Sequence, residues 1–338
     1  MSVSKSATTV FVSGASGFIA QNVIKQLLGN GYKVIGSVRS ESKGKELTDI
    51  IQSNDFQFAV IPDISAVGAF DDVLKSNSQI SVFIHTASPV TYSAKDVQNE
   101  LIKPAVEGTR NALNAIKLYG PQIKRVVVTS SFTAIALGKN FDHDKYYTEK
   151  DWNPVTLEQA LSNPEAAYAY AKKMAEKTVW DFVETESPTF KVTVVNPTVV
   201  FGPQAFGVKD KSKLNLLIEM INDILTLKPD DEIPPYASRC IDVRDVAKAH
   251  LVAFEKEEAI NQRLVLINQP FSNDLLAYII KKSFPVINIP EGNLERSREC
   301  IAKSCIKTDL TKTQEILGFD YVPVEKTILD TIQQLYDA

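Results

Sequence analysis

The stretch TTVFVSGASGFIA, residues 8–20, decides how this chain folds. A β-branched, apolar run, Thr8–Ser13, leads directly into Gly14 and Gly17 and then into a helical pattern. A helix that follows a strand in this way presents unpaired backbone amides at its N-terminus, and such amides bind the pyrophosphate of a dinucleotide. Gly14 suits the tight turn, and Gly17 lets the backbone come close to the phosphates.

The glycine spacing differs from the usual G-x-G-x-x-G pattern, because Gly14 and Gly17 lie three residues apart and Ala20 takes the third small position. A purely structural turn is therefore an alternative interpretation. We favour cofactor binding because a strand precedes the turn and a helix follows it, as the dinucleotide fingerprint requires.

The end of the second predicted strand indicates which dinucleotide is bound. NAD-binding units place Asp or Glu about 20 residues after the glycines, where it holds the ribose 2′-hydroxyl. Here Arg39 lies 22 residues after Gly17, and Lys43 lies one helical turn further. A guanidinium binds a 2′-phosphate through paired hydrogen bonds, and an ammonium adds charge. The alternative is a solvated base paired with Glu41, but the missing acid favours NADPH.

Short β-branched runs alternate with longer helical patterns up to about residue 200. The predicted strands are Thr8–Ser13, Tyr32–Arg39, Phe56–Ile61, Ser81–Thr86, Lys124–Ser130 and Lys191–Asn196. The predicted helices are Ile19–Asn30, Glu41–Gln52, Val67–Ser76, Asp96–Tyr119 (kinked or started late by Pro104) and Ala166–Thr185. This order predicts an α/β fold with a Rossmann-type, doubly wound parallel sheet.

The regular alternation of strand and helix patterns ends after Asn196. The stretches 201–240 and 268–338 read as irregular and rich in proline, whereas 241–254 reads as a helix and 263–267 as one more strand. We therefore predict an NADPH-binding Rossmann domain formed by residues 1–200 plus 241–267. A smaller, discontinuous C-terminal substrate lobe is predicted from 201–240 plus 268–338.

The composition is typical of a globular protein, with 338 residues, 44% of them hydrophobic and 23% charged. The net charge of −4 gives no general attraction to nucleic acid or to an anionic membrane. The first ten residues contain no apolar signal segment, and no run of 18 apolar residues occurs. We therefore expect a cytoplasmic protein with no nucleic-acid partner and no membrane partner.

Several other enzyme classes lack their motifs in this sequence. Neither the three histidines nor the three cysteines show a metal-ligand spacing, so no metal site is expected. The G-x-S-x-G elbow of many hydrolases and the G-x-x-x-x-G-K-[ST] loop of P-loop enzymes do not occur.

Tyr-x-x-x-Lys is a weak motif alone, and it occurs at Tyr146/Lys150, Tyr168/Lys172 and Tyr278/Lys282. The second pair opens the helix between the fifth and sixth strands, so it lies near the carboxyl edge of the sheet, where ligands bind. Its spacing puts both side chains on one helical face. The fifth strand ends in Ser130 and Ser131, which bring hydroxyls to the same edge. We predict that Ser131, Tyr168 and Lys172 form the reaction centre.

These residue types suit carbonyl reduction, which needs a hydride, a donor that polarises the oxygen and a proton for the alkoxide. A free tyrosine has a pKa near 10, and an ammonium within about 4–6 Å lowers that pKa by roughly 1–3. Lys172 would supply the ammonium and bind the nicotinamide ribose, while Ser131 would donate a hydrogen bond to the substrate oxygen. The alternative is an ordinary surface Tyr and Lys with a capping serine.

Two further strand ends should border the same crevice. Asp63 and Ile64 follow the third strand and are placed to meet the adenine. Thr86, Ala87 and Ser88 follow the fourth strand, where small side chains let a ribose lie close to the backbone.

Seven segments together resemble a known family: VFVSGASGFIA (10–20), HTAS (85–88), PAVEGT (104–109), VVVTSS (126–131), YAYAK (168–172), NPTVVFGP (196–203) and IDVRDVAKAHL (241–251). The chain resembles the extended short-chain dehydrogenase/reductase family, in its dihydroflavonol-4-reductase-like branch. Within that branch it is most similar to the yeast-type NADPH-dependent carbonyl reductases, described as methylglyoxal or 3-methylbutanal reductases.

The resemblance implies reduction of aldehydes or ketones (such as methylglyoxal, 3-methylbutanal, diketones or ketoesters) to alcohols, in a monomer or homodimer. It assigns catalysis to Ser131, Tyr168 as proton donor, and Lys172. The implied NADPH/NADP+ contacts are Gly14, Ser16, Gly17, Phe18, Ile19, Arg39, Lys43, Asp63, Ile64, Thr86, Ala87, Ser88, Tyr168, Lys172, Pro197 and Val199. The implied substrate pocket is lined by Val90, Tyr92, Phe132, Thr198 and Phe206.

Two competing functions remain at this point. An NAD-dependent hydroxysteroid-type or sugar-nucleotide-modifying enzyme would share the scaffold, although Arg39 speaks against NAD. A catalytically silent NADPH-binding sensor would share the cofactor site, although such proteins often lose the Tyr or the Lys, and both are present here.

Overall fold

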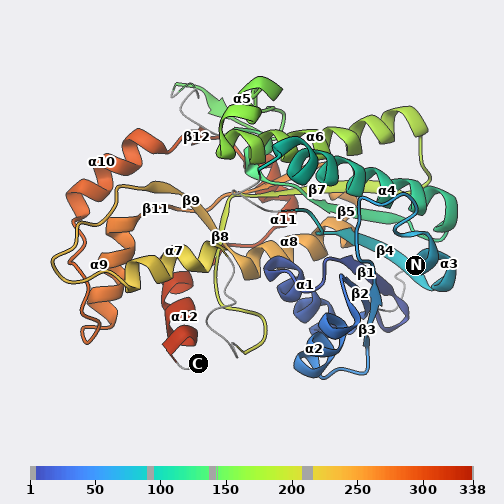
Figure 1. Ribbon diagram of the computed structural model, residues 1–338, viewed down its shortest axis with the longest axis horizontal. Helices are drawn as coiled ribbons and strands as arrows, with labels where there is room; N and C mark the ends of the chain where they lie inside the picture. Colours follow the sequence, from blue (N-terminus) through green and yellow to red (C-terminus); the bar gives the residue numbers. More distant parts are fainter. Residues whose placement is uncertain (1–4, 90–94, 137–141, 143, 208–215, 337–338) are drawn as a thin grey trace.

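A seven-stranded parallel sheet forms the centre of the molecule (Figure 1). The computed structural model describes residues 5–89, 95–136, 142, 144–207 and 216–336. The strand order is β10-β7-β5-β4-β1-β2-β3. Their bounds are β1 Thr9–Ser13, β2 Lys33–Val38, β3 Phe56–Val60, β4 Ile80–His85, β5 Arg125–Thr129, β7 Lys191–Pro197 and β10 Arg263–Leu266. The predicted Rossmann-type α/β fold is therefore confirmed.

Helices cover both faces of this sheet. Helices α1 (Phe18–Gly29) and α8 (Val243–Glu255) pack on one face, and α4 (Lys103–Tyr119) and α6 (Pro164–Glu186) pack on the other (Figure 1). Alternate residues of a strand enter different cores, so that Val10 and Val12 face α1 and α8 whereas Phe11 faces α4. Burial on both faces explains why the inner strands read as continuous apolar runs.

The order of the sheet reverses between β1 and β4. The chain runs outward from β1 through β2 and β3, and then crosses back so that β4 pairs with the other side of β1. In open α/β sheets, ligands bind outside the carboxyl ends of the strands at this reversal. The segments that follow Ser13 and His85 therefore lie at the position where a ligand is expected.

Two helices begin after the first residue of their sequence patterns. The pattern 96–119 contains a π-helical turn, Gln98–Ile102, before α4 starts at Lys103 with Pro104 in its first turn, so the late start expected from the proline is confirmed. The helix predicted from Val67 begins at Asp71 (α3, Asp71–Ser76), because Gly68 adopts a φ of +75° and interrupts the preceding turn. Helix α2 spans Glu41–Ile51, as the pattern predicts within one residue.

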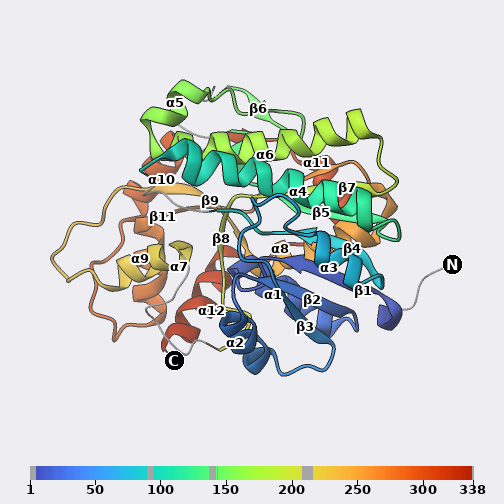
Figure 2. The same ribbon diagram turned by 45° about the vertical axis from the view of Figure 1, so that its right-hand side comes forward.

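The prediction that 201–240 and 268–338 are irregular is wrong. These stretches form much of a smaller lobe beside the sheet (Figure 2). Its elements are β8 Val199–Phe201, α7 Leu216–Leu225, β9 Ala237–Asp242, β11 Pro270–Ser272, α9 Asn273–Ser283, α10 Leu294–Ser304 and α12 Val324–Tyr336. Strands β11, β9 and β8 pair in that order, and a separate apolar core including Phe201 and Phe271 joins the elements. The prolines in these stretches do not prevent helices and strands from forming.

The helix predicted over 241–254 begins at Val243, because the residues before it belong to β9. Asp242 closes that strand, and its side chain accepts from the backbone N–H of Arg244, which caps α8. One sequence pattern thus covers the end of a strand and a whole helix.

The predicted division into two domains stays a prediction, because elements from the C-terminal part of the chain pack both in the smaller lobe and against the large sheet. Helix α11 (Thr311–Leu317) contributes Ile316 and Leu317 to the core under α1 and α8. The short strands β6 (Tyr146–Tyr147) and β12 (Lys307–Thr308) pair with each other, and α5 (Leu157–Ser162) lies beside α6.

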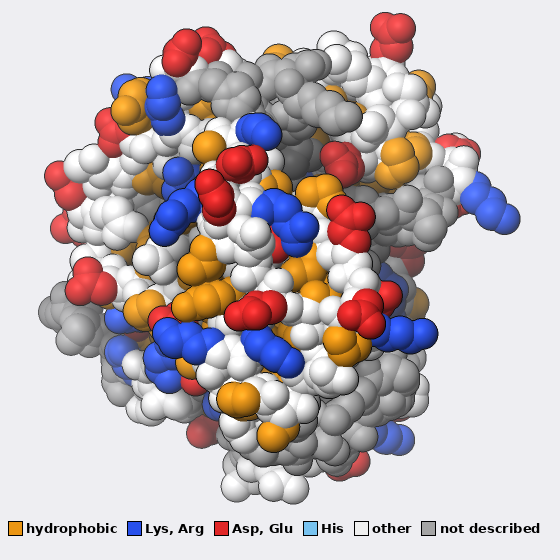
Figure 3. All heavy atoms as spheres, turned by 90° about the vertical axis from the view of Figure 1, so that its left-hand side faces the viewer, with side chains coloured by type: hydrophobic (Ala, Val, Ile, Leu, Met, Phe, Trp, Pro, Cys, Tyr) orange, Lys and Arg blue, Asp and Glu red, His pale blue; other side chains and the backbone are white. Residues whose placement is uncertain are grey.

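On the end of the smaller lobe, basic and acidic side chains are interspersed around apolar ones (Figure 3). Within the described residues, no helix has both the length and the apolar composition to cross a membrane.

Candidate active site

The glycine turn after β1 requires glycine at its first position. Gly14 has a φ of +66°, a left-handed conformation, and a Cβ placed on it would lie 3.0 Å from the Cα of Ala87. The N–H of Gly14 donates to the Ser37 hydroxyl over 3.1 Å, and the N–H of Ala15 donates to the Ser37 carbonyl. The turn is thus fixed against both β2 and the segment after β4.

Ser13 joins the ends of β1 and β4. Its hydroxyl accepts from the backbone N–H groups of Thr86 and Ala87 over 3.1 and 3.0 Å, and it lies 2.9 Å from Nδ1 of His85. Burial, with a smaller effect of the Lys172 charge, lowers the pKa of His85 to about 4, so this imidazole is neutral. His85 serves the packing of the strand ends.

The N-terminus of α1 fits a pyrophosphate. Gly17 is the N-cap residue, it provides no side-chain cap, and the first turn contains no acidic residue. Ser16 and Gly17 are exposed, while Phe18 and Ile19 pack against the core beneath. Backbone amides that no side chain caps, next to a left-handed glycine, form a site into which an anionic group can approach closely.

Arg39 is exposed at the end of β2, and its guanidinium makes no ion pair or hydrogen bond with any residue that the structure describes. Lys43 instead pairs with Glu46 over 2.7 Å, and Glu41 pairs with Lys45 over 3.7 Å. The alternative pairing of Glu41 with Arg39 is therefore not observed. An exposed guanidinium beside the N-terminus of α2, which Ser40 caps, suits a phosphate.

Asp63 and Ile64 lie near this basic end. Hydrogen bonds from Ser65 lower the pKa of Asp63, and the nearby charge of Arg39 lowers it further. Ile64 lies against Gly108 of α4, where an added Cβ would come within 2.7 Å of its Cδ1. The side chains of Arg39 and Asp63 thus lie close enough for their charges to interact, and Ile64 is the next residue after Asp63.

Helix α6 carries Tyr168 and Lys172 on one face. Asn163 caps its N-terminus, and Pro164 occupies the first turn. Nζ of Lys172 lies 5.8 Å from the centroid of the Tyr168 ring. Lys172 is buried, and burial lowers its pKa to about 8 although the charge of Glu176 acts in the opposite direction. An ammonium with so low a pKa exchanges its proton near neutral pH.

Ser131 follows β5 and is buried at the same edge of the sheet. It caps a short 3-10 turn, η3 (Phe132–Ala134), by accepting from the N–H of Thr133 over 3.2 Å. Nδ2 of Asn196, near the end of β7, donates to the Ser131 carbonyl over 3.2 Å. Pro197 is the last residue of β7, and after Thr198 the strand β8 begins at Val199.

Glu176 connects the elements of the site, and the sequence analysis missed it. This carboxylate is 1% exposed and accepts from the Ser130 hydroxyl over 2.6 Å and from Nδ2 of Asn196 over 2.7 Å. Its other oxygen accepts from Nε of Arg263 over 2.6 Å and from Trp180 over 3.2 Å. The spacing to Lys172 and Tyr168, four and eight residues, could have indicated this shared face.

We expect Glu176→Gln to lower the free energy of unfolding by about 3 kcal/mol or more, because it leaves two buried cations, Arg263 and Lys172, without their shared counter-charge. Chemical denaturation monitored by tryptophan fluorescence measures this change. Glu184→Gln on the exposed side of the same helix is the matched control, expected within about 0.5 kcal/mol of the wild type. Equal stability of the two variants would contradict the structural role assigned to Glu176.

A small internal cavity of about 10 Å³ lies where these elements meet. Its lining includes Ala87 and Ser88 after β4, Ser130 after β5, and Lys172 and Glu176 of α6. The glycine turn reaches the same place, because Gly14 touches Ala87. The glycine turn, the segments after β4 and β5, and Lys172 of α6 thus converge on one edge of the sheet.

The predicted substrate residues are only partly brought together. Phe132 follows Ser131 and packs against the apolar cluster that includes Ile135 and Ile267, and Thr198 lies between β7 and β8. Phe206 instead lies against Lys25 of α1, whose Nζ is 6.0 Å from its ring centroid. Val90 and Tyr92 lie outside the described residues.

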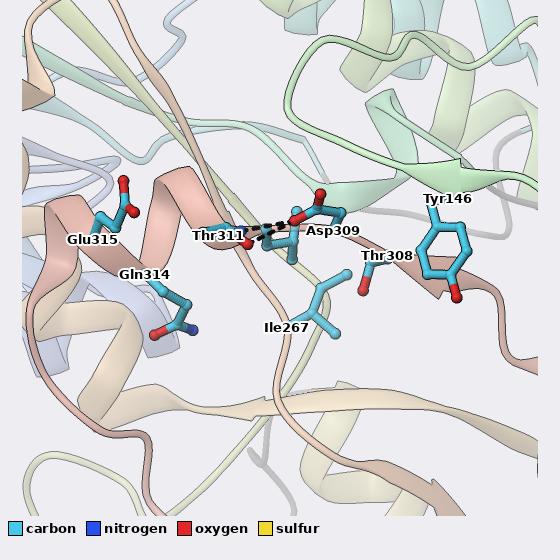
Figure 4. Close-up of a pocket in the computed structure, with 8 residues that line it drawn as sticks. Tyr146, Ile267, Thr308, Asp309, Thr311, Gln314 and Glu315 are labelled. Carbon is cyan, nitrogen blue, oxygen red and sulfur yellow. Dashed lines mark hydrogen bonds between the residues drawn. The ribbon is translucent and has the colours of Figure 1, made fainter.

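A separate groove of about 590 Å³ lies beside β6, β12 and α11 (Figure 4). Tyr146, Ile267 and Gln314 contribute to its lining, and none of the predicted catalytic or cofactor residues does. The Asp309 carboxylate at its wall accepts from the N–H and the hydroxyl of Thr311, so its hydrogen bonds stabilise the start of α11. The large groove and the predicted site are different places.

Comparison with known proteins agrees with this geometry. Residues 10–267 match the NAD dependent epimerase/dehydratase family. The NADPH-dependent methylglyoxal reductase GRE2 of Saccharomyces cerevisiae is 42% identical over 335 residues, which cover 97% of this chain and 98% of that protein. The structure of Gre2 from Candida albicans in complex with NADPH has 44% identity and a TM-score of 0.94, covering 98% of this chain and 99% of that one. The yeast methylglyoxal/isovaleraldehyde reductase Gre2 complexed with NADPH has 41% identity and a TM-score of 0.92, covering 98% of both chains.

Proposed function

Because the chain belongs to the NAD dependent epimerase/dehydratase family, we propose that it reduces aldehydes and ketones to alcohols with NADPH as its cofactor. Relatives that match it over nearly their whole length are named NADPH-dependent methylglyoxal reductases or methylglyoxal/isovaleraldehyde reductases. The observation that carries the proposal is the convergence of Tyr168, buried Lys172 and Ser131 on the sheet edge that the glycine turn also borders.

The residues present fit NADPH. The uncapped amides of Gly17 and its neighbours suit the pyrophosphate, and the exposed guanidinium of Arg39 suits the 2′-phosphate. We assign Lys43 to the same phosphate, where its ammonium would exchange Glu46 for the ligand. Ala87, Ser88, Pro197 and Val199 would line the remaining length of the cofactor, as their strand ends border the crevice.

The bound cofactor supplies the hydride that the carbonyl carbon receives. Ser131 donates a hydrogen bond to the substrate oxygen and stabilises the negative charge that develops there. Tyr168 transfers its phenolic proton to that oxygen, and the ammonium of Lys172 stabilises the resulting phenolate. Glu176 positions the strand end at Ser130 through a hydrogen bond, and its charge stabilises the ammonium of Lys172. The phenol then recovers its proton from solvent, which completes the cycle.

The alternative of an NAD-dependent enzyme on the same scaffold is disfavoured by Arg39. An acidic residue at that position would hold the 2′-hydroxyl of NAD and repel a 2′-phosphate, whereas a guanidinium attracts it. We also propose that the protein is cytoplasmic and acts as a monomer or homodimer on a small-molecule carbonyl. Fractionation of cells and light scattering of the purified protein test these two points.

The assay that tests the proposed function mixes the protein, NADPH and methylglyoxal or 3-methylbutanal, and follows the loss of NADPH absorbance. We expect turnover with NADPH and at least tenfold weaker turnover with NADH at equal concentration. Tight NADPH binding without turnover across a broad panel of aldehydes and ketones would contradict the proposal and favour a sensor.

The rate should also depend on pH in a defined direction. Burial lowers the pKa of Lys172 to about 8, so its ammonium is present below that pH and is lost above it. We therefore expect kcat/KM for carbonyl reduction to fall as the pH is raised through about 8. In Lys172→Arg, whose guanidinium stays charged, the residual activity should lack this alkaline decline. A wild-type profile that is flat to pH 10 would exclude this role of Lys172.

A further inference from the structure

Arg239 on β9 lacks the partner that a partly buried guanidinium needs. Its Nε is buried without an acceptor, and its side chain forms no hydrogen bond or ion pair with any residue in the described part of the chain. Arg244 and Arg296, by contrast, each donate to a carboxylate. An unpaired buried donor lowers stability and therefore calls for an explanation, which an acceptor atom of a bound ligand would provide.

The strand register places Arg239 next to the reaction centre. Val199 of β8 pairs with Cys240 of β9, so Arg239 lies opposite Thr198, whose hydroxyl donates to its carbonyl over 2.9 Å. Thr198 comes two residues after Asn196, which holds the carbonyl of Ser131. Figure 1 shows β8 and β9 running from the edge of the large sheet into the smaller lobe.

The electrostatic surroundings give the same placement. Burial raises the pKa of the Cys305 thiol, and the charge of Arg239 acts against that rise. Burial likewise raises the pKa of Tyr236, and the charges of Glu165 and Cys305 add to the rise. Glu165 lies three residues before Tyr168 on α6. Arg239 thus belongs to the group of side chains with which the smaller lobe faces the start of the catalytic helix.

We propose that Arg239 determines substrate specificity by donating hydrogen bonds to a second acceptor oxygen of the substrate. The inference rests on the proposed carbonyl reductase activity and predicts that, among its carbonyl substrates, compounds with a second oxygen, such as vicinal dicarbonyls and oxo-esters, are preferred over simple aldehydes and ketones. One carbonyl receives the hydride at carbon and the Tyr168 proton at oxygen. The second oxygen stays unreduced and accepts from the guanidinium, a charge-assisted bond that a simple aldehyde cannot form.

The test compares hexane-2,3-dione with hexan-2-one, which have the same carbon chain and differ in the second oxygen. Two quantities are measured with the full-length protein. The first is the ratio of kcat/KM for the dione to kcat/KM for the ketone with NADPH. The second is the ratio of their dissociation constants for the NADP+ complex, in which no reduction occurs, by calorimetry. Arg239→Met removes the donor and keeps an apolar stem, and Arg298→Met, at an exposed position on α10, is the matched control.

We expect Arg239→Met to lower the dione-to-ketone ratio of kcat/KM and to raise the dione-to-ketone ratio of dissociation constants, each by about tenfold to a hundredfold, the contribution of one charge-assisted hydrogen bond. Arg298→Met should keep the wild-type ratios. Ratios that stay at the wild-type value in Arg239→Met would overturn the proposal, whether or not overall activity falls. Weakened NADP+ binding with unchanged ratios would likewise overturn it, since Arg239 would then serve the cofactor. A wild-type protein that reduces neither compound nor any other carbonyl would instead contradict the proposed function.

Discussion

Tyr168→Phe should lower kcat for carbonyl reduction by about a hundredfold to ten-thousandfold, the range that a positioned general acid contributes. The substitution removes one hydroxyl and keeps the ring over which the Lys172 ammonium lies, 5.8 Å from its centroid. Cofactor binding should change little, because the groups assigned to the phosphates lie at the other end of the crevice. The measurements are single-turnover rates with NADPH and methylglyoxal and the dissociation constant of NADPH by fluorescence.

Tyr170→Phe is the matched control for this variant. Tyr170 lies two residues further on the same helix, with its ring beside Lys173, and the same hydroxyl is lost. Its activity should stay within about twofold of the wild type. If Tyr168→Phe retained full activity, or if both variants lost activity equally, Tyr168 could not be the proton donor.

Arg39→Leu should weaken NADPH binding by about a hundredfold while changing NADH binding by less than about threefold. A guanidinium that binds a phosphate through two charge-assisted hydrogen bonds contributes roughly this much, and NADH lacks the phosphate. The expected outcome is a loss of selectivity between the two cofactors, measured as the ratio of their dissociation constants. Arg39 has no described partner to lose, so stability should be nearly unchanged.

Lys45→Leu provides the control for Arg39→Leu. It removes one positive charge from the same region, on α2, where Lys45 pairs with Glu41. A general electrostatic effect would lower NADPH affinity in both variants, whereas a phosphate site formed by Arg39 predicts a loss in one. Equal weakening of NADPH and NADH by Arg39→Leu would show that the side chain does not distinguish the 2′-phosphate.

The inner strands of the large sheet could be predicted within one or two residues because each is buried on both faces and therefore reads as an apolar run. The small strands of the other lobe could not. Val199–Phe201 and Pro270–Ser272 have three residues each, and they form strands because β9, distant in sequence, lies between them. Helix α10 buries Ser297 rather than an apolar stripe, so periodicity gives no signal for it. Helix α9 did carry such a stripe, including Leu276 and Ile280, which the sequence analysis missed.

The site divides in the same way. Tyr168 and Lys172 could be predicted because their spacing is local, and Glu176 could have been added on the same ground. The bond between Ser13 and His85 depends on the register of β1 against β4, which the sequence does not specify. That Arg239 has no partner among the described residues is a property of the whole fold, since any of the acidic residues could have been its partner. Such features become visible only when distant segments are placed together.

The central claim is that this protein transfers a hydride from NADPH to a carbonyl carbon, and isotopic labelling tests it most directly. NADPH deuterated at one or the other position of the nicotinamide C4 is mixed with the protein and hexane-2,3-dione, and the alcohol is examined by mass spectrometry. We predict one deuterium on the carbinol carbon from one of the two labelled cofactors and none from the other. An alcohol without deuterium from either cofactor, or no alcohol from this or any other carbonyl, would contradict the account.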